Sequence, residues 1–506
     1  MKKQVFNPFL PLNEYIPDGE PHVFGDRIYL FGSHDTAGGA RYCSEGDYVG
    51  WSAPLTDLTD WRYEGVIFDS RQDPRAEGRA VDLYAPDVVQ GNDGRYYLYY
   101  CAEGLSASTW STVIGVAVCD EPAGRYEYLG TLRNPDGSPF LQYLTADPGL
   151  INDDGVIRMY YGWSLSLVGA AANGRGGEPN HEAQSMPREQ LIPIETKVFG
   201  RSEEELRALP EDLMGANVIE LENDMLTVRG RAKRIVPGQL NALGSGFEGH
   251  AFYEASSIRK INGVYYFIYS SQESNELCYA TSLFWDRDFQ FRGTIISNGD
   301  VGYGGRRPED RLNMTGNDHG SIECINGQWY VFHHRQTHNS TFSRQACAEP
   351  IRLLPDGSIP QVECTSCGLN GGPLQAQGSY PAAICCVLTN GHMPHITNRT
   401  LNGDIPYITH ENDSQVVVNV KDGTQIGYKY FAFAGPVSLS VTVRGTGGGS
   451  LHVSDGEQEL AVLVLAASEP WSTCTATIDA QGVCPLYFRY QGPESIDLLS
   501  FSFSSL

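Results

Sequence analysis

Residues 93–100 read D-G-R-Y-Y-L-Y-Y, a tight turn followed by a strand rich in aromatic residues. Asp-Gly and Asn-Gly pairs between apolar strands are typical of β-hairpins, because both central residues of such a turn need positive φ. The pattern occurs four more times, as G-D-R-I-Y-L-F-G at 25–32, D-G-V-I-R-M-Y-Y at 154–161, N-G-V-Y-Y-F-I-Y at 262–269 and N-G-Q-W-Y-V-F-H at 326–333. The chain therefore repeats one hairpin five times.

The spacing of these hairpins predicts a five-bladed β-propeller. The turn glycines at positions 25, 94, 155, 263 and 327 are separated by 69, 61, 108 and 64 residues. Three intervals suit one blade of four short strands, and radial repetition of such blades protects the edges of the sheets. An open β-solenoid is the alternative, but its repeats are usually much shorter. The long third interval predicts an insertion at about 169–246, in which Ser202 could cap a short helix.

The hairpin pattern ends after about Gly357, where a connector rich in Gly, Ser and Pro begins. Eight short segments with alternating polar and apolar residues follow, and this number of strands in about 115 residues is typical of a β-sandwich. We therefore expect an all-β chain with a propeller domain over residues 1–365 and a sandwich domain over residues 380–506.

Charge and composition exclude several classes of partner. The 506 residues carry a net charge of −25, so the chain would repel a phosphate backbone and we expect no nucleic-acid partner. The sequence contains no run of about 18 apolar residues, which is the length that a membrane-spanning helix needs, so we expect no membrane partner. Residues 1–14 contain no apolar stretch of signal-peptide length, and the twelve scattered cysteines suit buried free thiols, so we expect a cytoplasmic protein.

An ionisable residue precedes every turn glycine by seven to nine residues, and these residues are Asp18, Asp87, Asp147, Glu254 and His319. Each could simply cap its strand. If the strand that carries it is the innermost strand of a blade, however, all five converge on the propeller axis, where like charges shift one another's pKa. Carboxylates around a groove suit glycoside hydrolysis, in which one acid protonates the leaving oxygen and another activates water. Tyr84 and Trp163 could pack against sugar rings there, or belong to the core.

The same segments resemble glycoside hydrolase family 43 over about residues 5–360. The resemblance rests on N-P-F-L-P and P-D-G-E-P-H-V-F-G-D-R-I-Y-L-F-G-S-H-D near the N-terminus, Y-A-P-D at 84–87, T-A-D-P-G-L-I-N-D-D-G from residue 145, F-Y-E-A-S-S-I from 252 and G-N-D-H-G-S-I from 316. It implies a five-bladed propeller that acts on arabinose- and xylose-containing polymers.

The resemblance also implies a role for each residue. Asp18 would be the general base, although the family usually has Asp-Pro where this chain has Asp18-Gly19, so Glu20 is a rival base. Glu254 would be the general acid, and Asp147 would orient it and tune its pKa. His319 would lie under the site, where it could face a calcium ion or a water cluster, and Asp87 would line the substrate pocket.

We therefore expect an inverting glycosidase that needs no cofactor and releases terminal α-L-arabinofuranosyl or β-D-xylosyl units from imported oligosaccharides. The alternatives are a non-catalytic sugar-binding propeller and a glycosidase of the same fold that acts on another sugar, such as galactofuranose or galactan. The retaining fructan-cleaving families are disfavoured, because their opening W-M-N-D-P-N is absent. The sandwich resembles a carbohydrate-binding module of family 6 type, and its alternative role is to support the propeller.

Overall fold

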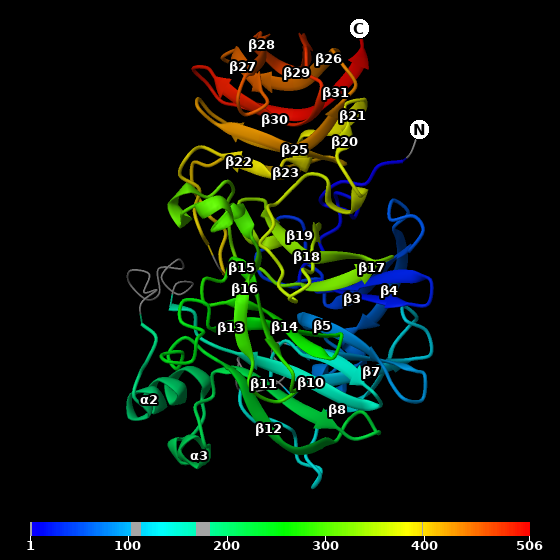
Figure 1. Cartoon of the computed structure of the whole chain (residues 1–506), viewed down its shortest axis with the longest axis vertical. Coiled ribbons are helices and arrows are strands. Elements are labelled where there is room, and N and C mark those ends of the chain that lie inside the picture. The colour runs from blue at the N-terminus through cyan, green and yellow to red at the C-terminus, as the bar shows by residue number, and fades with distance from the viewer. Residues whose placement is uncertain (1–2, 103–112, 168–182, 397) are drawn as a thin grey trace.

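The computed structural model describes residues 3–102, 113–167, 183–396 and 398–506. Five small sheets form the lower part of the molecule in Figure 1, coloured blue to green, and two larger sheets form the upper part, coloured yellow to red.

The five small sheets follow one another along the chain, and all their strands pair antiparallel with their sequence neighbours. The first two are β1 (Glu20–Phe24), β2 (Arg27–Phe31), β3 (Asp47–Pro54) and β4 (Arg62–Asp69), then β5 (Leu83–Gln90), β6 (Tyr96–Ala102), β7 (Gly115–Cys119) and β8 (Glu127–Thr131). The third and fourth are β9 (Gly149–Asp153), β10 (Val156–Trp163), β11 (Gly215–Leu221) and β12 (Val228–Pro237), then β13 (Phe252–Ile261), β14 (Val264–Ser271), β15 (Glu276–Ser282) and β16 (Gln290–Ser297). The fifth consists of β17 (Ser321–Ile325), β18 (Gln328–Thr337) and β19 (Ser340–Ile351).

The first strands of the five sheets form a closed ring. Strand β1 contacts β5, β5 contacts β9, β9 contacts β13, β13 contacts β17, and β17 contacts β1 again. All five turn glycines have positive φ, between 63° and 89°, as the hairpin pattern requires. The predicted five-bladed propeller is therefore confirmed, with the start of each repeat on the axis.

Two details of the predicted propeller are wrong. The insertion is shorter than 169–246, because residues 215–237 form the outer strands β11 and β12 of the third blade. Residues 169–182 of that range lie outside the described residues. The fifth blade has three described strands rather than four, and the N-terminal segment lies beside its last strand β19, since the N–H of Phe9 donates to the carbonyl of Ala346 over 3.3 Å.

Helices α2 (Arg188–Phe199) and α3 (Glu203–Ala208) lie in the described part of the insertion. The Ser202 hydroxyl accepts from the N–H of Glu205, so the predicted cap is present. Apolar side chains of both helices pack against Leu144 and Leu240 at the edge of the third blade. Figure 1 shows them beside the lower blades.

The C-terminal part is a sandwich of two six-stranded sheets. One sheet contains β20 (Leu374–Gln375), β22 (Val387–Thr389), β25 (Gln425–Phe433), β27 (Gly449–Ser454), β28 (Glu459–Leu465) and β30 (Gly482–Gln491). The other contains β21 (Gly378–Pro381), β23 (Tyr407–Glu411), β24 (Ser414–Val420), β26 (Val437–Gly445), β29 (Ser468–Ile478) and β31 (Ile496–Ser505). The sheets share one apolar core, and their strands begin before the expected boundary at residue 380.

Among the described residues, no helix is both long and apolar enough to span a bilayer. All twelve cysteines are free thiols, but only six of them are buried and the other six are partly buried.

Candidate active site

Four of the five predicted axial residues lie together at the start of the inner strands. Asp18, Asp147 and His319 stand just before β1, β9 and β17, and Glu254 lies near the start of β13. The His319 Nδ1 atom is 3.8 Å from Asp18 Oδ1 and 3.9 Å from Asp147 Oδ2, so the imidazole bridges the two carboxylates. Because these residues occupy equivalent positions in their repeats, three acids and a histidine from four blades lie close together.

The surroundings of Asp18 favour its ionised form. Its side chain accepts hydrogen bonds from Arg344 Nη1 at 2.8 Å and from the Ser33 hydroxyl at 2.6 Å. Burial opposes ionisation, but the charge of the Arg344 guanidinium outweighs it and holds the pKa of Asp18 below its ordinary value. Asp18 is therefore a carboxylate over a wide pH range.

The surroundings of Glu254 favour its protonated form. Burial, aided by the negative charge of Asp147, raises the pKa of Glu254 to about 8. Trp163 Nε1 donates to Glu254 Oε2 over 3.2 Å, and Asn317 Nδ2 donates to Glu254 Oε1 over 3.3 Å. The carboxyl group is thus held at both oxygens and carries a proton at neutral pH.

Asp147 is fixed beside Glu254 by the backbone. The N–H of Ala255, the residue after Glu254, donates to Asp147 Oδ2 over 3.0 Å. Burial raises the pKa of Asp147, whereas this hydrogen bond and nearby His319 oppose the rise. Asp18, Asp147 and Ala255 all have positive φ, at 57°, 46° and 71°, a backbone region that is costly for residues other than glycine. Such backbone conformations cluster at sites that must aim a side chain.

Glu20 and Asp87 belong to a second group. One ligand atom each from Glu20, His22 and Asp87 lies within 4.8 Å of the others. Glu20 Oε1 accepts from Arg259 Nη1 at 2.8 Å, and Asp87 accepts from the N–H of Leu150 at 2.6 Å. Glu20 is therefore occupied by an arginine of β13, which makes it a weaker candidate for the base than Asp18. Asp87 is 1% exposed and tied to backbone, which does not favour the predicted contact with substrate.

The two predicted aromatic residues differ in position. The Tyr84 side chain packs against the apolar core of the second and third blades. Trp163 donates its N–H to Glu254, and its ring contacts Tyr253 and Phe199 at centroid distances of 5.8 and 6.0 Å. Trp163 is therefore placed to hold the acid, and Tyr84 to fill the core.

The side chains around His319 supply few ligands to the calcium ion that it could face. Calcium takes six to eight oxygen ligands. Within the described part of the chain, His319 belongs to no group of three ligating side chains, and its nearest acidic oxygens are those of Asp18 and Asp147. The oxygen-rich group at Glu20 already faces the Arg259 charge. A further group that could hold a metal ion, made by His250, Glu276 and Cys278, lies in the fourth blade.

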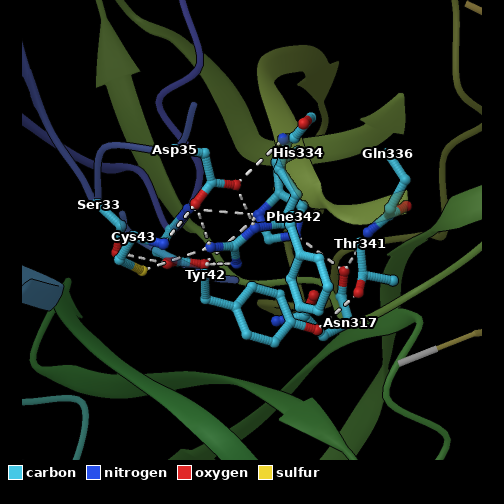
Figure 2. A network of polar contacts seen from close by, with 12 residues as sticks. Ser33, Asp35, Tyr42, Cys43, Asn317, His334, Gln336, Thr341 and Phe342 are labelled. Atoms are coloured by element: carbon cyan, nitrogen blue, oxygen red, sulfur yellow. Dashed lines mark hydrogen bonds and ion pairs between the residues drawn. The ribbon is translucent and has the colours of Figure 1, made fainter. Parts of the chain in front are cut away.

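The sequence did not identify the residues behind Asp18. Arg344 is 2% exposed at its side chain and pairs with Asp35 through two nitrogens, at 2.8 and 3.1 Å, as well as with Asp18. Figure 2 shows this network from Ser33, Asp35 and Cys43 to His334 and Asn317. The signal was an arginine in the otherwise uncharged strand segment T-F-S-R-Q-A-C-A at 341–348. A buried charge of this kind needs a partner.

His334 connects the two sides of the site. Burial lowers the pKa of His334 to about 3, so its ring is neutral. Its Nε2 lies 2.8 Å from the carbonyl oxygen of Asn317, and its Nδ1 accepts from the N–H of Asp18 over 3.3 Å. One tautomer satisfies both contacts, and it links the backbone of Asp18 to the residue that holds Glu254.

This arrangement combines an ionised carboxylate, a protonated carboxyl group and a third acid that keeps the second one protonated. Two titratable groups whose surroundings separate their pKa values are suited to act as base and acid in one reaction. In glycoside hydrolysis, the base activates water and the acid protonates the leaving oxygen.

Comparisons with known proteins agree with this chemistry. The model of glycosyl hydrolases family 43 matches residues 12–176 and 200–359. A xylosidase/arabinosidase of Thermoclostridium stercorarium is 40% identical and covers 99% of both chains, and one of Bacteroides ovatus is 27% identical over 70% of this chain and 97% of its own. A GH43_1 enzyme of Xanthomonas citri, solved in complex with xylotriose, has a TM-score of 0.51 and 22% identity over 71% of this chain and 94% of its own, a likeness in fold.

Proposed function

The chain belongs to glycosyl hydrolase family 43 and is a glycosidase of the xylosidase/arabinofuranosidase type, in which we propose that Asp18, Asp147 and Glu254 hydrolyse terminal glycosidic bonds with inversion. The substrates are the α-L-arabinofuranosyl and β-D-xylosyl ends of oligosaccharides. The observation that carries the proposal is the opposite pKa shift of two carboxyl groups in one site, Asp18 lowered and Glu254 raised to about 8.

In the proposed mechanism, ionised Asp18 takes a proton from a water molecule while that water attacks the anomeric carbon. Glu254 gives its proton to the leaving oxygen. Asp18 gains one proton and Glu254 loses one, so the number of protons on the enzyme does not change in this step. Asp147 is a positioning residue: its carboxylate raises the pKa of Glu254, and the Ala255 N–H fixes its place. No step uses a metal ion or cofactor.

The catalytic reading is favoured over a non-catalytic sugar-binding propeller by the burial of these acids. Binding a neutral sugar does not require a carboxyl group whose pKa is raised to about 8 beside two other acids, whereas general acid catalysis near neutral pH does.

The test is a panel of 4-nitrophenyl glycosides, with α-L-arabinofuranoside, β-D-xylopyranoside and β-D-galactofuranoside. We expect turnover of one or both of the first two. Asp18→Asn and Glu254→Gln should each lower kcat by about 10³-fold without loss of the folded state, and Glu20→Gln serves as the matched control. The base assignment is wrong if Glu20→Gln is inactive while Asp18→Asn retains substantial activity.

A further inference from the structure

One loop of the sandwich domain reaches the active site. Between β22 and β23, residues 393–396 and 398–401 run along the propeller, and we refer to these two stretches as the strap. Met393 and Ile396 pack with Met314 of the propeller in a small apolar cluster of their own. The strap is therefore anchored by packing as well as by hydrogen bonds.

The first half of the strap holds the segment that supports the acid. The N–H of Thr315 donates to the carbonyl of Pro394 over 3.0 Å, and the N–H of Ile396 donates back to the carbonyl of Thr315 over 2.8 Å. These two bonds pair the strap with the chain two residues before Asn317, whose amide donates to Glu254. The position of that amide thus depends on the strap.

The second half of the strap holds the wall behind the base. The N–H of Asn398 donates to the Tyr42 hydroxyl over 3.0 Å, and this hydroxyl donates to Thr341 Oγ1 over 3.1 Å. The N–H of Thr341 in turn donates to the carbonyl of Arg399 over 3.2 Å. Figure 2 shows Tyr42, Thr341 and Phe342 on one side of the network.

Tyr42 connects these contacts to Asp18. The Arg344 guanidinium carbon lies 4.7 Å from the centre of the Tyr42 ring, a cation–π distance, and the same guanidinium donates to Asp18. The Tyr42 ring and Phe342 contact each other edge to face at 4.8 Å. The rings of Tyr42 and Phe342, which the strap holds in place, thus limit the movement of the Arg344 guanidinium. Because this guanidinium donates to Asp18, they also limit the movement of the base.

We propose that the strap positions two parts of the active site, Asn317 beside the acid Glu254 and Tyr42 with Arg344 beside the base Asp18. The sandwich domain would then be needed for catalysis by the propeller. The inference rests on the proposed function and adds to it. It assigns positioning roles to Tyr42 and Ile396, and it requires no sugar binding by the sandwich.

The test compares two core truncations within the sandwich domain. Ile396→Ala removes packing from the strap, and Leu463→Ala removes a side chain of similar burial from β28, in the main core of the sandwich. Both variants are assayed at a temperature at which both are folded. We expect Ile396→Ala to lower kcat about tenfold or more, with a smaller change in KM, because small displacements of catalytic groups are costly. Its pH–rate profile should also shift, whereas Leu463→Ala should keep the wild-type kcat and profile.

A folded Ile396→Ala enzyme with the kcat and pH profile of Leu463→Ala overturns the proposal. If Ile396→Ala does not fold, Tyr42→Phe decides, because it keeps the ring over Arg344 and removes only the hydroxyl that joins Asn398 to Thr341. We expect a reduced kcat with little change in Tm, and an unchanged kcat refutes the positioning role. Absence of turnover in the wild-type enzyme on every glycoside would instead refute the proposed function.

Discussion

Burial raises the pKa of Glu254, and the negative charge of Asp147 raises it further. Two ionised carboxylates in one buried site repel each other, and the hydrogen bond from the Ala255 N–H stabilises the charge on Asp147. The proton therefore remains on Glu254. Asp18 lies beside the Arg344 guanidinium and stays ionised, which keeps the base and the acid in opposite states near neutral pH.

Asp147→Asn should move the alkaline limb of the pH–rate profile. Activity is lost as Glu254 loses its proton, so the alkaline limb reports a pKa of about 8. Removing the Asp147 charge lowers that pKa, and the limb should shift to lower pH by about one unit, with a lower kcat. Asp87→Asn, in the neighbouring axial group, is the control and should leave the limb in place. An unshifted limb in Asp147→Asn would remove its role in tuning Glu254.

Glu254→Gln should change the pH dependence of stability. The folded-state pKa of Glu254 is raised from 4.5 to about 8, so the stability it contributes is fully present below pH 4.5 and is lost as the pH rises through 8. Glutamine does not titrate. Between pH 4.5 and 8 the free energy of unfolding of Glu254→Gln should therefore rise relative to wild type, by about 5 kcal/mol. Urea unfolding of both proteins across this range measures the difference, and parallel curves would contradict the raised pKa.

The acids could be predicted from the sequence because each stands seven to nine residues before a turn glycine, and the hairpin register carries it to the axis. Arg344 and Asp35 have no such marker: they meet across 309 residues of chain, in an ion pair that only the closed ring creates. Trp163 was predicted either to pack against a sugar ring or to belong to the core, and its hydrogen bond to Glu254 was not foreseen, since the sequence does not show which edge of an aromatic ring faces an acid.

At the scale of single elements, the start of β13 is shaped by an irregular register. Strand β13 is out of step with β14 on both sides of Glu254, between Phe252 and Glu254 and again between Glu254 and Ser257. Ala255 takes the left-handed conformation there, and its N–H turns toward Asp147. This irregularity aims the acid and its partner at the same point.

Ala255 provides a test of this geometry. A β-branched residue tolerates positive φ poorly, so Ala255→Val should lower the free energy of unfolding by about 2 kcal/mol and should reduce kcat by displacing the N–H from Asp147. Ala255→Gly accepts the same φ and should keep both quantities close to wild type, with stability within about 1 kcal/mol. Thermal unfolding and 4-nitrophenyl glycoside assays measure the two effects. Equal stability of the Val and Gly variants would show that the left-handed conformation is not maintained.

The inner hairpins were easier to predict than the outer strands. Inner strands carry aromatic runs after an Asx-Gly turn, whereas β12 reads V-R-G-R-A-K-R-I-V-P and buries little more than its ends, so its pattern is weak. This is why residues 215–237 were assigned to an insertion. The fifth blade was expected to have four strands because the local pattern does not reveal that the N-terminal segment lies beside β19.

At the scale of the whole molecule, the sandwich and the propeller share polar contacts well beyond the strap. Arg335 of β18 donates to the carbonyls of Ala383 and Cys385 at 2.8 and 3.2 Å, and Lys429 of β25 donates to Asp300 over 2.8 Å. A sandwich that only binds sugar would need no buried ion pair with the propeller. The sequence left the role of the sandwich open, because these contacts join residues far apart in the chain and depend on how the two parts dock.

The arrangement of the blades predicts the stereochemical outcome of the reaction. Asp18 precedes β1 of the first blade and Glu254 lies on β13 of the fourth, and in the ring of inner strands β1 stands between β5 and β17. The two residues thus reach the site from blades that are not adjacent. Carboxyl groups about 6.5–9.5 Å apart leave room for a water molecule and give inversion, whereas about 5–5.5 Å gives a covalent intermediate and retention. The separation across the axis favours the first case.

The first sugar released from an aryl β-xyloside or α-arabinofuranoside should therefore have the opposite anomeric configuration, visible by proton NMR before mutarotation. Retained configuration, or a trapped glycosyl-enzyme adduct at Asp18, would refute direct displacement by water.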